Sequence, residues 1–452
     1  MCNMPEVAMS RSIRIKGRGS VNGTATVPGD KSISHRVAML ASIASGASSV
    51  YGFATSADCL ATLDCVQKLG VRVDRDAGGL IIHGAGLNGY GPEGARVNLY
   101  AGNSGSTIRM LSGLLAAQSF TSVIDGDESL RRRPMARVIE PLTMMGATIS
   151  ASGGKFAPLV IEGGKLKPIE YASRVASAQV KTCVLFAGLY ADGRTTVTEP
   201  ARSRNHTELM LKEFGARITN DRSPLDSISV EGGYELTPVD YQVPGDISSA
   251  AFIVAAATVL PGSRVVIRDV NLNPTRTAFL DVLNALGANV ERQNVQERHG
   301  EPVGDLLVTS RSLKGDGPVM KLAAESVPNI IDEIPILAVI GTQVEGRIEI
   351  REAGELRIKE SDRIRTIVDG VKAMGGEIEE FEDGFAVEGP RQLKGARIET
   401  AGDHRIAMAF SIAGLIAEGV TEIVDADCAA VSFPEFYDLL NTLSGGKHIA
   451  RS

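Results

Sequence analysis

A glycine that ends a helix recurs six times along this chain. In each case an amphipathic helical pattern stops at the glycine and a β-rich run follows, as in CVQKLGVRV and VLNALGANV. Glycine is the usual residue at a helix exit because it adopts the left-handed backbone conformation there without strain. The spacing of about 70–90 residues is longer than that of common solenoids and predicts one supersecondary unit used six times. The six glycines are Gly70, Gly146, Gly215, Gly287, Gly375 and Gly446.

A second set of six helical runs alternates with the first. Each of these runs is apolar on nearly every face, as in ISSAAFIVAAATVLPG, whereas a surface helix would show a polar face. We therefore expect six buried helices, with short β-rich runs such as PLVIEG and GFAVEG between the two sets. The repeating unit is helix, strands, helix, and the fold class is α/β.

The tetrapeptide VPGD occurs twice, at 27–30 and 243–246, in matching places of the repeat pattern. A chain of 452 residues exceeds what one hydrophobic core usually covers. We predict two domains of three repeats each, one formed by residues 28–243 and the other by residues 1–27 plus 244–452. The strand within 13–27 would close the second domain, and the two tetrapeptides would be the hinge.

Composition narrows the kinds of ligand that this chain can bind. The net charge is −7, Trp is absent and aromatic residues are 4%, so no broad cationic or base-stacking surface for nucleic acid is expected. Apolar runs stop short of the roughly 18 residues of a membrane span, and the first residues lack the apolar core of a secretion signal. The five scattered cysteines contain no CxxC pair. We expect a cytoplasmic protein in which a local cluster of cations holds any anionic ligand.

Polar residues gather at the starts of the predicted buried helices. The N-termini of parallel helices meet at one end of a domain, where free N–H groups and partial positive charge form an anion site. Taken alone, each residue has an ordinary explanation: a cation such as Lys31 is usually solvated, and an acid such as Asp332 beside an apolar helix is usually a cap. Their shared position in the repeat favours one anion-binding cleft between the domains. The starts read GDKSISHR, GNSGSTIR, SAQVK, GDISS, NIIDEIP and AGDHR.

Seven stretches together resemble the 5-enolpyruvylshikimate-3-phosphate (EPSP) synthase family, and more closely its second bacterial class, which includes glyphosate-tolerant forms. They follow one another in family order between about Ile13 and Leu443. The resemblance implies the two-domain enolpyruvyl transferase fold, an inverted α/β barrel-like arrangement with three β–α units and buried parallel helices in each domain. The stretches are PGDKSISHR, GNSGSTIRMLSG, DGDESLRRRPMARV, ASAQVKTCVLFAGL, IDEIPILAV, LRIKESDRI and DHRIAMAF.

The resemblance implies the activity of a 3-phosphoshikimate 1-carboxyvinyltransferase. The enolpyruvyl group of phosphoenolpyruvate passes to the 5-hydroxyl of shikimate 3-phosphate and phosphate leaves, a step of the shikimate pathway to chorismate and the aromatic amino acids. Both substrates are phosphorylated carboxylates, so cations and helix N-termini must offset their mutual repulsion. The planar fork of arginine suits both groups. We expect no metal or cofactor, because these cations already offset the phosphate charge. We also expect a monomer, and glyphosate is a possible inhibitor.

The resemblance also implies which residues hold the two substrates. Some positions serve both sides, since the substrates must lie next to each other. On the shikimate 3-phosphate side these are Lys31, Ser32, Arg36, Ser177, Ala178, Gln179, Arg204, Asp332 and Lys359. On the phosphoenolpyruvate side these are Lys31, Gly105, Arg133, Gln179, Arg363 and Arg405.

Two acid–base groups are needed for this reaction. The 5-hydroxyl loses a proton while C3 of phosphoenolpyruvate gains one, and the tetrahedral intermediate then returns the proton from C3 and expels phosphate. We expect Asp332 on the hydroxyl side. We expect Glu360 on the C3 side, with Lys31 as its rival.

Two alternatives differ from this interpretation in testable features. The UDP-N-acetylglucosamine enolpyruvyl transferases share the repeats but use a Cys in the loop before Arg-Pro, where DGDESLRRRP has Asp127 and no Cys. A catalytically inactive phosphosugar-binding protein would need neither Asp332 nor Glu360.

One departure from some relatives is Val431, where they have a Lys that contacts phosphoenolpyruvate, so we assign that segment no role. Gly105 is kept where some tolerant relatives have Ala.

Overall fold

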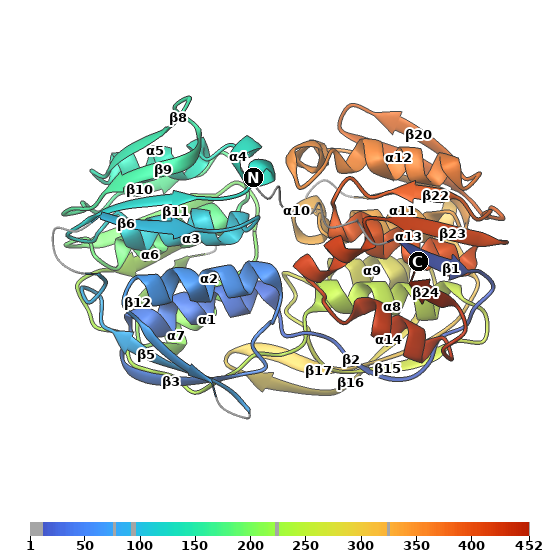
Figure 1. Cartoon of the computed structure of the whole chain (residues 1–452), viewed down its shortest axis with the longest axis horizontal. Helices are drawn as coiled ribbons and strands as arrows, with labels where there is room; N and C mark the ends of the chain where they lie inside the picture. The colour runs from blue at the N-terminus through green and yellow to red at the C-terminus, as the bar shows by residue number, and fades with distance from the viewer. Residues whose placement is uncertain (1–11, 76–77, 92–95, 222–225, 323–325, 452) are drawn as a thin grey trace, which may run out of the picture.

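Two lobes lie side by side in the structure, a computed structural model that describes residues 12–75, 78–91, 96–221, 226–322 and 326–451 (Figure 1). Each lobe has its own hydrophobic core. The core of the first lobe runs from Ile33 to Val243, and that of the second lobe combines Ile13 to Ala25 with Ile247 to Leu443. In the described ranges, no helix has the length and apolar character needed to cross a bilayer.

Six copies of one unit build the described part of the chain, three in each lobe. Every unit has a four-stranded sheet. In the first unit the strand order is β14 (Tyr241–Gln242), β3 (Ser45–Tyr51), β5 (Gly79–Ala85) and β4 (Arg72–Arg75). Here β14 runs parallel to β3, while β5 runs antiparallel to both β3 and β4. The other five sheets repeat this pattern of one parallel pair and two antiparallel pairs. The predicted sixfold repeat is confirmed, and the structure adds one strand in each unit, after the buried helix and before the amphipathic helix that follows it.

The first lobe contains units one to three. Unit one comprises α1 (Lys31–Ile43), β3 (Ser45–Tyr51), α2 (Ala57–Lys68), β4 (Arg72–Arg75), β5 (Gly79–Ala85) and β14 (Tyr241–Gln242). Unit two comprises β6 (Arg96–Tyr100), α3 (Gly105–Leu115), β7 (Thr121–Asp125), α4 (Glu128–Arg132), α5 (Ala136–Met144), β8 (Thr148–Ser152) and β9 (Phe156–Glu162). Unit three comprises β10 (Glu170–Ala172), α6 (Ala178–Gly188), β11 (Arg194–Glu199), α7 (His206–Glu213), β12 (Arg217–Asp221) and β13 (Asp226–Glu231).

The second lobe contains units four to six. Unit four comprises β2 (Asn22–Thr26), α8 (Ile247–Val259), β15 (Arg264–Asn271), α9 (Ala278–Ala285), β16 (Asn289–Arg298) and β17 (Glu301–Thr309). Unit five comprises β18 (Leu313–Lys321), α10 (Val327–Ile330), α11 (Ile334–Gly341), β19 (Val344–Ile350), the 3-10 helix η2 (Gly354–Ile358), α12 (Arg363–Ala373), β20 (Glu377–Phe381) and β21 (Gly384–Gly389). Unit six comprises β22 (Arg397–Glu399), α13 (His404–Ile416), β23 (Val420–Val424), the 3-10 helix η3 (Ala426–Val431), α14 (Phe436–Leu443), β1 (Ile13–Lys16) and β24 (Ile449–Arg451).

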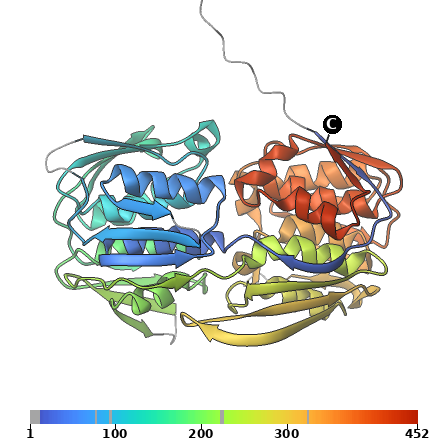
Figure 2. The ribbon, with the colours of Figure 1, turned by 60° about the horizontal axis from the view of Figure 1, so that its bottom comes forward.

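The second helix set forms the interior of the lobes, as predicted. Helix α8 is buried from Ile247 to Thr258, and α13 is buried from His404 to Leu415. The sheets cover these helices from outside; Figure 2 shows β16 and β17 in yellow below α8. The six helix-exit glycines all have positive φ, between 73° and 100°. An inverted arrangement with helices inside and sheets outside follows from these burial patterns.

The chain crosses between the lobes twice, and the two crossings are hydrogen-bonded to each other. Gly29 and Gly245 form an antiparallel bridge. The Asp30 amide donates to the carbonyl of Pro244 at 2.7 Å, and the Asp246 amide donates to that of Pro28 at 2.8 Å. Strands β1 and β2, which precede the first crossing, pair with strands of the second lobe. Residues 1–11 of the predicted second domain lie outside the described residues.

Candidate active site

A cleft of about 510 Å³ lies between the two lobes. Its walls include the starts of the buried helices, namely Lys31 of α1, Gly105 of α3, Ala178 of α6 and His404 of α13, with Asp246 just before α8. Their N–H groups and the positive ends of the helices gather around one cavity. The predicted convergence of helix starts is therefore confirmed.

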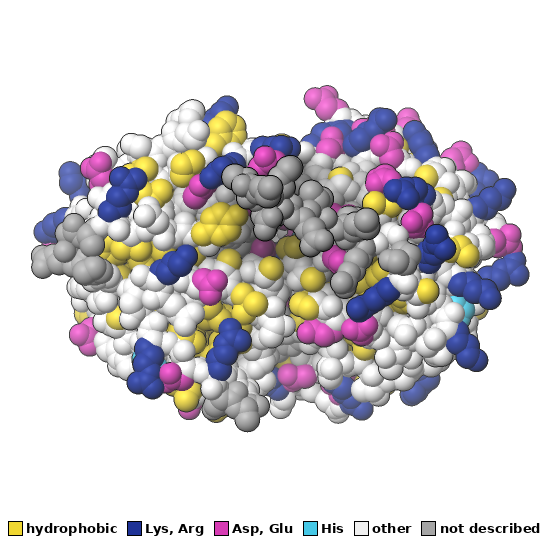
Figure 3. Space-filling view, in the orientation of Figure 1, with side chains coloured by type: hydrophobic (Ala, Val, Ile, Leu, Met, Phe, Trp, Pro, Cys, Tyr) yellow, Lys and Arg dark blue, Asp and Glu magenta, His cyan; other side chains and the backbone are white. Residues whose placement is uncertain are grey.

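The cleft is rich in cations although the chain as a whole is acidic, with a net charge of −7. Nine Lys and Arg side chains and six Asp and Glu side chains line it among the described residues. On the face in Figure 3, by contrast, acidic and basic side chains are interspersed. The cleft is therefore a place where this acidic protein can bind anions. The cations are Lys31, Arg109, Arg133, Arg137, Arg204, Arg276, Lys359, Arg363 and Arg405, and the acids are Asp58, Asp246, Asp332, Glu352, Glu355 and Glu360.

All but one of the residues predicted for the shikimate 3-phosphate side line the cleft. Arg204 donates to Asp332 Oδ2 at 2.5 Å and to Ser32 Oγ at 3.4 Å. Ser177 caps α6 by accepting from the Val180 amide at 3.5 Å. The residues that line the cleft are Lys31, Ser32, Ser177, Ala178, Gln179, Arg204, Asp332 and Lys359.

Arg36 is the exception. Its side chain is buried beneath the cleft wall, where it donates to Thr207 Oγ1 at 2.7 Å and to Thr182 Oγ1 at 3.0 Å. It also donates to the carbonyl oxygen of Ser32 at 2.8 Å. Arg36 therefore supports the start of α1 from behind in this arrangement, and the wall itself is formed by Lys31 and Ser32.

The residues predicted for the phosphoenolpyruvate side all line the cleft. Arg133 donates to Asn103 Oδ1 at 2.6 Å and lies 3.4 Å from Glu360 across the cleft. Arg363 is 1% exposed and pairs with Asp403 at 2.8 Å. Within the described part of the chain, Nε of Arg133 and Nη1 of Arg363 have no hydrogen-bond acceptor, although Nη1 of Arg363 lies 3.6 Å from Asp332 Oδ1 in an ion pair. Buried donors without acceptors in a cleft favour an anionic ligand.

Arginines hold the two predicted acid–base carboxylates in the ionised form. Burial pushes the pKa of Asp332 upward, but Arg405 and Arg204 outweigh it and hold the pKa well below its ordinary value. Burial also pushes the pKa of Glu360 upward, but Arg363 and Arg133 outweigh it and hold this pKa well below its ordinary value. Both groups therefore start as bases in the arrangement described.

Lys31 stands opposite these acids and stays protonated. Burial lowers its pKa, but the adjacent Asp58, which forms an ion pair with its ammonium group, outweighs burial and raises the pKa. Lys359 behaves differently, because burial lowers its pKa in spite of Asp332 and Glu355 nearby. Lys31 is thus a proton-carrying cation at the start of α1.

Several cleft residues were missed by sequence reasoning. Arg109 donates to Gln179 Oε1 at 2.8 Å, and Arg137 donates to Glu355 Oε1 of the other lobe at 2.9 Å. A usable signal existed for Arg109, which is the one cation in the apolar helical run of GNSGSTIRMLSG. Asp58 and Glu355 lie in ordinary amphipathic stretches, and nothing in their local pattern distinguishes them.

A buried charge cluster lies behind the wall that is predicted to bind shikimate 3-phosphate. Lys181 lies 2.7 Å from Glu199 Oε2 and 2.7 Å from Glu208 Oε1, and all three side chains are at most 7% exposed. Glu199 also accepts from the Ser177 amide at 3.0 Å and from Ser203 Oγ at 2.8 Å. The cluster therefore ties the start of α6 to the loop that carries Arg204.

Comparison with known proteins identifies the family. The family model for EPSP synthase (3-phosphoshikimate 1-carboxyvinyltransferase) matches residues 15–440. The chain belongs to the EPSP synthase family. It is 49% identical over 432 residues to the 3-phosphoshikimate 1-carboxyvinyltransferase of Solibacter usitatus, which covers 95% of this chain and 99% of that relative. The Bacillus subtilis enzyme of the same name is 46% identical over 428 residues, or 94% of this chain and 98% of the relative.

A solved EPSP synthase shares the fold. The structure of EPSP synthase from Acinetobacter baumannii superimposes with a TM-score of 0.85 at 42% identity and covers 98% of this chain and 100% of that one. The expected enolpyruvyl transferase fold is confirmed. As a member of the EPSP synthase family, the chain is a transferase of the shikimate pathway, which serves aromatic amino acid biosynthesis, and its reaction is enolpyruvyl transfer.

Proposed function

We propose that the cleft between the lobes is where this chain transfers the enolpyruvyl group of phosphoenolpyruvate to the 5-hydroxyl of shikimate 3-phosphate. The observation that carries the proposal is the pair of ionised carboxylates, Asp332 and Glu360, set among nine cations in one cavity. Two anionic substrates need the cations, and two proton transfers need the carboxylates.

Shikimate 3-phosphate would lie against the first lobe. Its phosphate would accept from Ser177, Gln179 and Arg204, near the N-terminus of α6. Ser32 and Lys31 at the start of α1 would bind it from the neighbouring helix, supported by Arg36. Lys359 would reach it from the second lobe.

Phosphoenolpyruvate would bind between Arg133 and Gly105 of the first lobe and Arg363 and Arg405 of the second. Arg133 and Arg363 each hold a buried nitrogen without an acceptor among the described residues. An anion at this position would satisfy both, and bidentate contacts would orient its carboxylate and phosphate. Binding to both lobes would also favour a closed arrangement.

Asp332 would be the base for the 5-hydroxyl. Its carboxylate is ionised before the reaction because Arg405 and Arg204 hold its pKa low, so it can take up the proton of the 5-hydroxyl. The hydroxyl oxygen then bonds to C2 of phosphoenolpyruvate as C3 gains a proton, which gives the tetrahedral intermediate. Loss of a C3 proton and of phosphate completes the transfer.

Glu360 would exchange the proton at C3, although its pKa lies well below the ordinary value in the arrangement described. The cause of the low pKa, after the opposing effect of burial, is the charge of Arg363 and Arg133, the two residues proposed to bind phosphoenolpyruvate. When the substrate anion pairs with these cations, the pKa of Glu360 rises, and Glu360 can take up a proton from solvent and pass it to C3. Lys31, which is protonated before the reaction, is the rival donor.

Phosphate release with shikimate 3-phosphate and phosphoenolpyruvate tests the proposal. Wild type should release phosphate, and Asp332→Ala and Glu360→Ala should each lower kcat by about 10²–10⁴-fold. Transfer in ²H₂O decides between the C3 donors: Glu360→Gln should abolish deuterium incorporation at C3 and Lys31→Met should only slow it. Phosphate release with a UDP-sugar acceptor alone would refute the assignment.

We also propose a hinge at the two VPGD segments, between a domain of residues 28–243 and one of residues 1–27 plus 244–452. The two segments are the backbone crossings between lobes, and they are hydrogen-bonded to each other. Closure on shikimate 3-phosphate would complete the cation cluster and exclude water. Small-angle scattering that stays the same on addition of shikimate 3-phosphate would contradict closure.

Three further properties belong to the same proposal. Glyphosate would inhibit by occupying the phosphoenolpyruvate side. The enzyme would act as a monomer, since the two lobes of one chain already complete the cleft. It would work in the cytoplasm, where the thiols of Cys59, Cys65, Cys183 and Cys428, all free here, stay reduced.

A further inference from the structure

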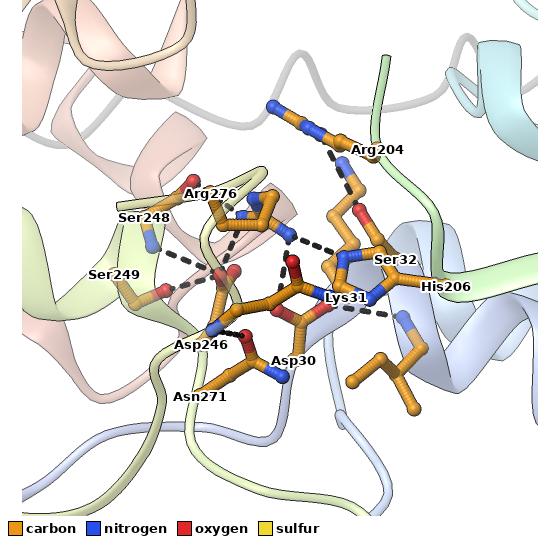
Figure 4. Close-up of polar contacts among 12 residues, drawn as sticks. Asp30, Lys31, Ser32, Arg204, His206, Asp246, Ser248, Ser249, Asn271 and Arg276 are labelled. Atoms are coloured by element: carbon orange, nitrogen blue, oxygen red, sulfur yellow. Dashed lines mark hydrogen bonds and ion pairs between the residues drawn. The ribbon is translucent and has the colours of Figure 1, made fainter. Parts of the chain in front are cut away.

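One arginine binds the aspartates of both VPGD segments. Arg276, in the loop between β15 and α9, donates to Asp30 Oδ2 at 3.0 Å and to Asp246 Oδ1 at 3.1 Å (Figure 4). The three side chains are at most 6% exposed. The repeated tetrapeptide therefore provides two carboxylates, one at each crossing between the lobes, and a single guanidinium joins them.

On the first lobe, this bond holds the start of α1. Asp30 caps the helix, because its Oδ1 accepts from the Ile33 amide at 3.0 Å while its other oxygen accepts from Arg276. Lys31 and Ser32, the first two residues of the helix, line the cleft. The side-chain position of Asp30, and with it the start of α1, is thus fixed from the second lobe.

On the second lobe, the same guanidinium reaches the segment of the proposed base. Asp246 caps α8 by accepting from the Ser248 amide at 2.9 Å, and Arg276 also donates to Ser248 Oγ at 2.8 Å. Ser248 Oγ in turn donates to the carboxylate of Glu333, the residue after Asp332. Two hydrogen bonds therefore separate Arg276 from the peptide that carries Asp332.

Arg276 lies between the two aspartates and its charge favours the ionised form of both. Burial raises the pKa of Asp246, and the charge of Asp30 adds to this effect against the opposing charge of Arg276. Burial also opposes ionisation of Asp30, but Arg276 and His206 outweigh it and hold its pKa below the ordinary value. Burial lowers the pKa of Arg276 itself, yet Asp30 and Asp246 outweigh that effect and raise it.

We propose that Arg276 is a positioning residue for enolpyruvyl transfer, whose fork sets the start of α1 in the first lobe against the Asp332 segment in the second. The proposal rests on the function proposed above for Asp332. Arg276 acts through Asp30 and through Ser248 and Glu333. Arg276 thereby sets the distance between the 5-hydroxyl of shikimate 3-phosphate, bound by the first lobe, and Asp332 of the second lobe. A small error in this distance lowers kcat more than it weakens substrate binding.

The test replaces the fork while keeping the charge. Lysine carries its charge on one nitrogen, so it cannot keep the geometry in which one nitrogen of Arg276 binds Asp30 and the other binds Asp246 and Ser248 Oγ. We expect Arg276→Lys to lower kcat for phosphate release at least about tenfold, while the Kd of shikimate 3-phosphate measured by calorimetry changes less than about threefold. The matched control is Arg365→Lys, because Arg365 also bridges two carboxylates, those of Asp369 and Glu380, but on the exposed face of α12. This control should match wild type.

A second variant covers the case in which the first fails to fold. Asp246→Asn combined with Arg276→Met keeps the net charge of the cluster and removes the bridge, so it should fold and show the same loss of kcat with binding retained. Wild-type turnover in either folded variant would overturn the proposal, and so would a parallel loss of turnover and binding. Unfolding of both variants would also overturn it, because Arg276 would then be needed for folding. Failure of the proposed function is distinct, because wild type itself would then release no phosphate with shikimate 3-phosphate.

Discussion

Arg204 of the first lobe donates a 2.5 Å hydrogen bond to Asp332 of the second. Both side chains are about one-fifth exposed, so the pair closes part of the cleft without being sealed from solvent. The same arginine lies beside Ser32, on the proposed acceptor wall. One guanidinium therefore faces both the proposed phosphate site and the proposed base, and the electrostatic state of the base depends on it.

Replacing Arg204 should change the pH at which the base becomes protonated. Removal of a cation raises the pKa of a neighbouring carboxylate, so the protonated and inactive form of Asp332 appears at higher pH. We expect the acid limb of kcat/KM in Arg204→Met to move upward by about one pH unit. Arg202→Met is the control, since Arg202 is exposed in the same loop. An acid limb at the wild-type position would show that Arg204 does not act on the base.

Gly105→Ala should separate glyphosate from phosphoenolpyruvate. An added Cβ at Gly105 would lie 2.8 Å from Arg109 Nη1 and 3.6 Å from Arg133 Nη1, so the Arg109 guanidinium, which lines the cleft, must move. The bulkier inhibitor should suffer more, with the ratio of glyphosate Ki to phosphoenolpyruvate KM rising at least about tenfold. Gly164→Ala, where the added Cβ meets open space, is the control. Equal losses for both ligands would refute this prediction.

Lys181→Met should damage both stability and acceptor binding. The variant leaves Glu199 and Glu208 buried without their cation, which should lower the free energy of unfolding by about 3–5 kcal/mol in urea titrations. Since Glu199 also accepts from the Ser177 amide, KM for shikimate 3-phosphate should rise more than KM for phosphoenolpyruvate. Lys212→Met, at an exposed position of α7, should change neither quantity. Equal rises in both KM values would argue against a role on the acceptor side.

His404 should make the protein less stable in acid. Burial, aided by the positive charge of Arg405, lowers its pKa to about 3. Below the ordinary pKa of 6.5, the unfolded chain therefore binds a proton at His404 that the folded chain does not bind. The contribution of His404 to the free energy of unfolding is complete above pH 6.5 and is lost as the pH falls toward 3. Between about pH 7 and pH 5, wild type should lose about 2 kcal/mol more unfolding free energy than His404→Asn. Parallel curves for the two proteins would contradict a neutral, buried imidazole.

The architecture was predictable because its signals are local. Glycines at helix exits and helices without a polar face are properties of short windows, and six copies of each predicted the six units. The convergence of helix starts followed from the direction of the buried helices. The expected roles of Asp332 and Glu360 came from family resemblance and stay predictions, although both side chains do line the cleft.

The long-range contacts were not predictable, because no local pattern encodes them. Arg276 and Asp30 are 246 positions apart, and Arg276 lies in an unremarkable NPTRTAF stretch. Arg36 shows a related difficulty. Its place one turn after Ser32 suggests the cleft, but the packing of α1 against α7 turns its side chain toward Thr207 and Thr182 instead.

The first lobe is an insertion in the sequence of the second, and the pairing of Gly29 with Gly245 brings the two ends of the insertion together. Its two ends meet at a hydrogen bond between Asp30 and Pro244, and β14, the last strand before the exit, pairs with β3, the first strand after the entry. The two ends of the inserted lobe are therefore adjacent in space although they are far apart in sequence. The sheets and core of this lobe should keep their arrangement if new chain ends were opened in one of its surface loops, so circular permutation within the first lobe is compatible with the fold.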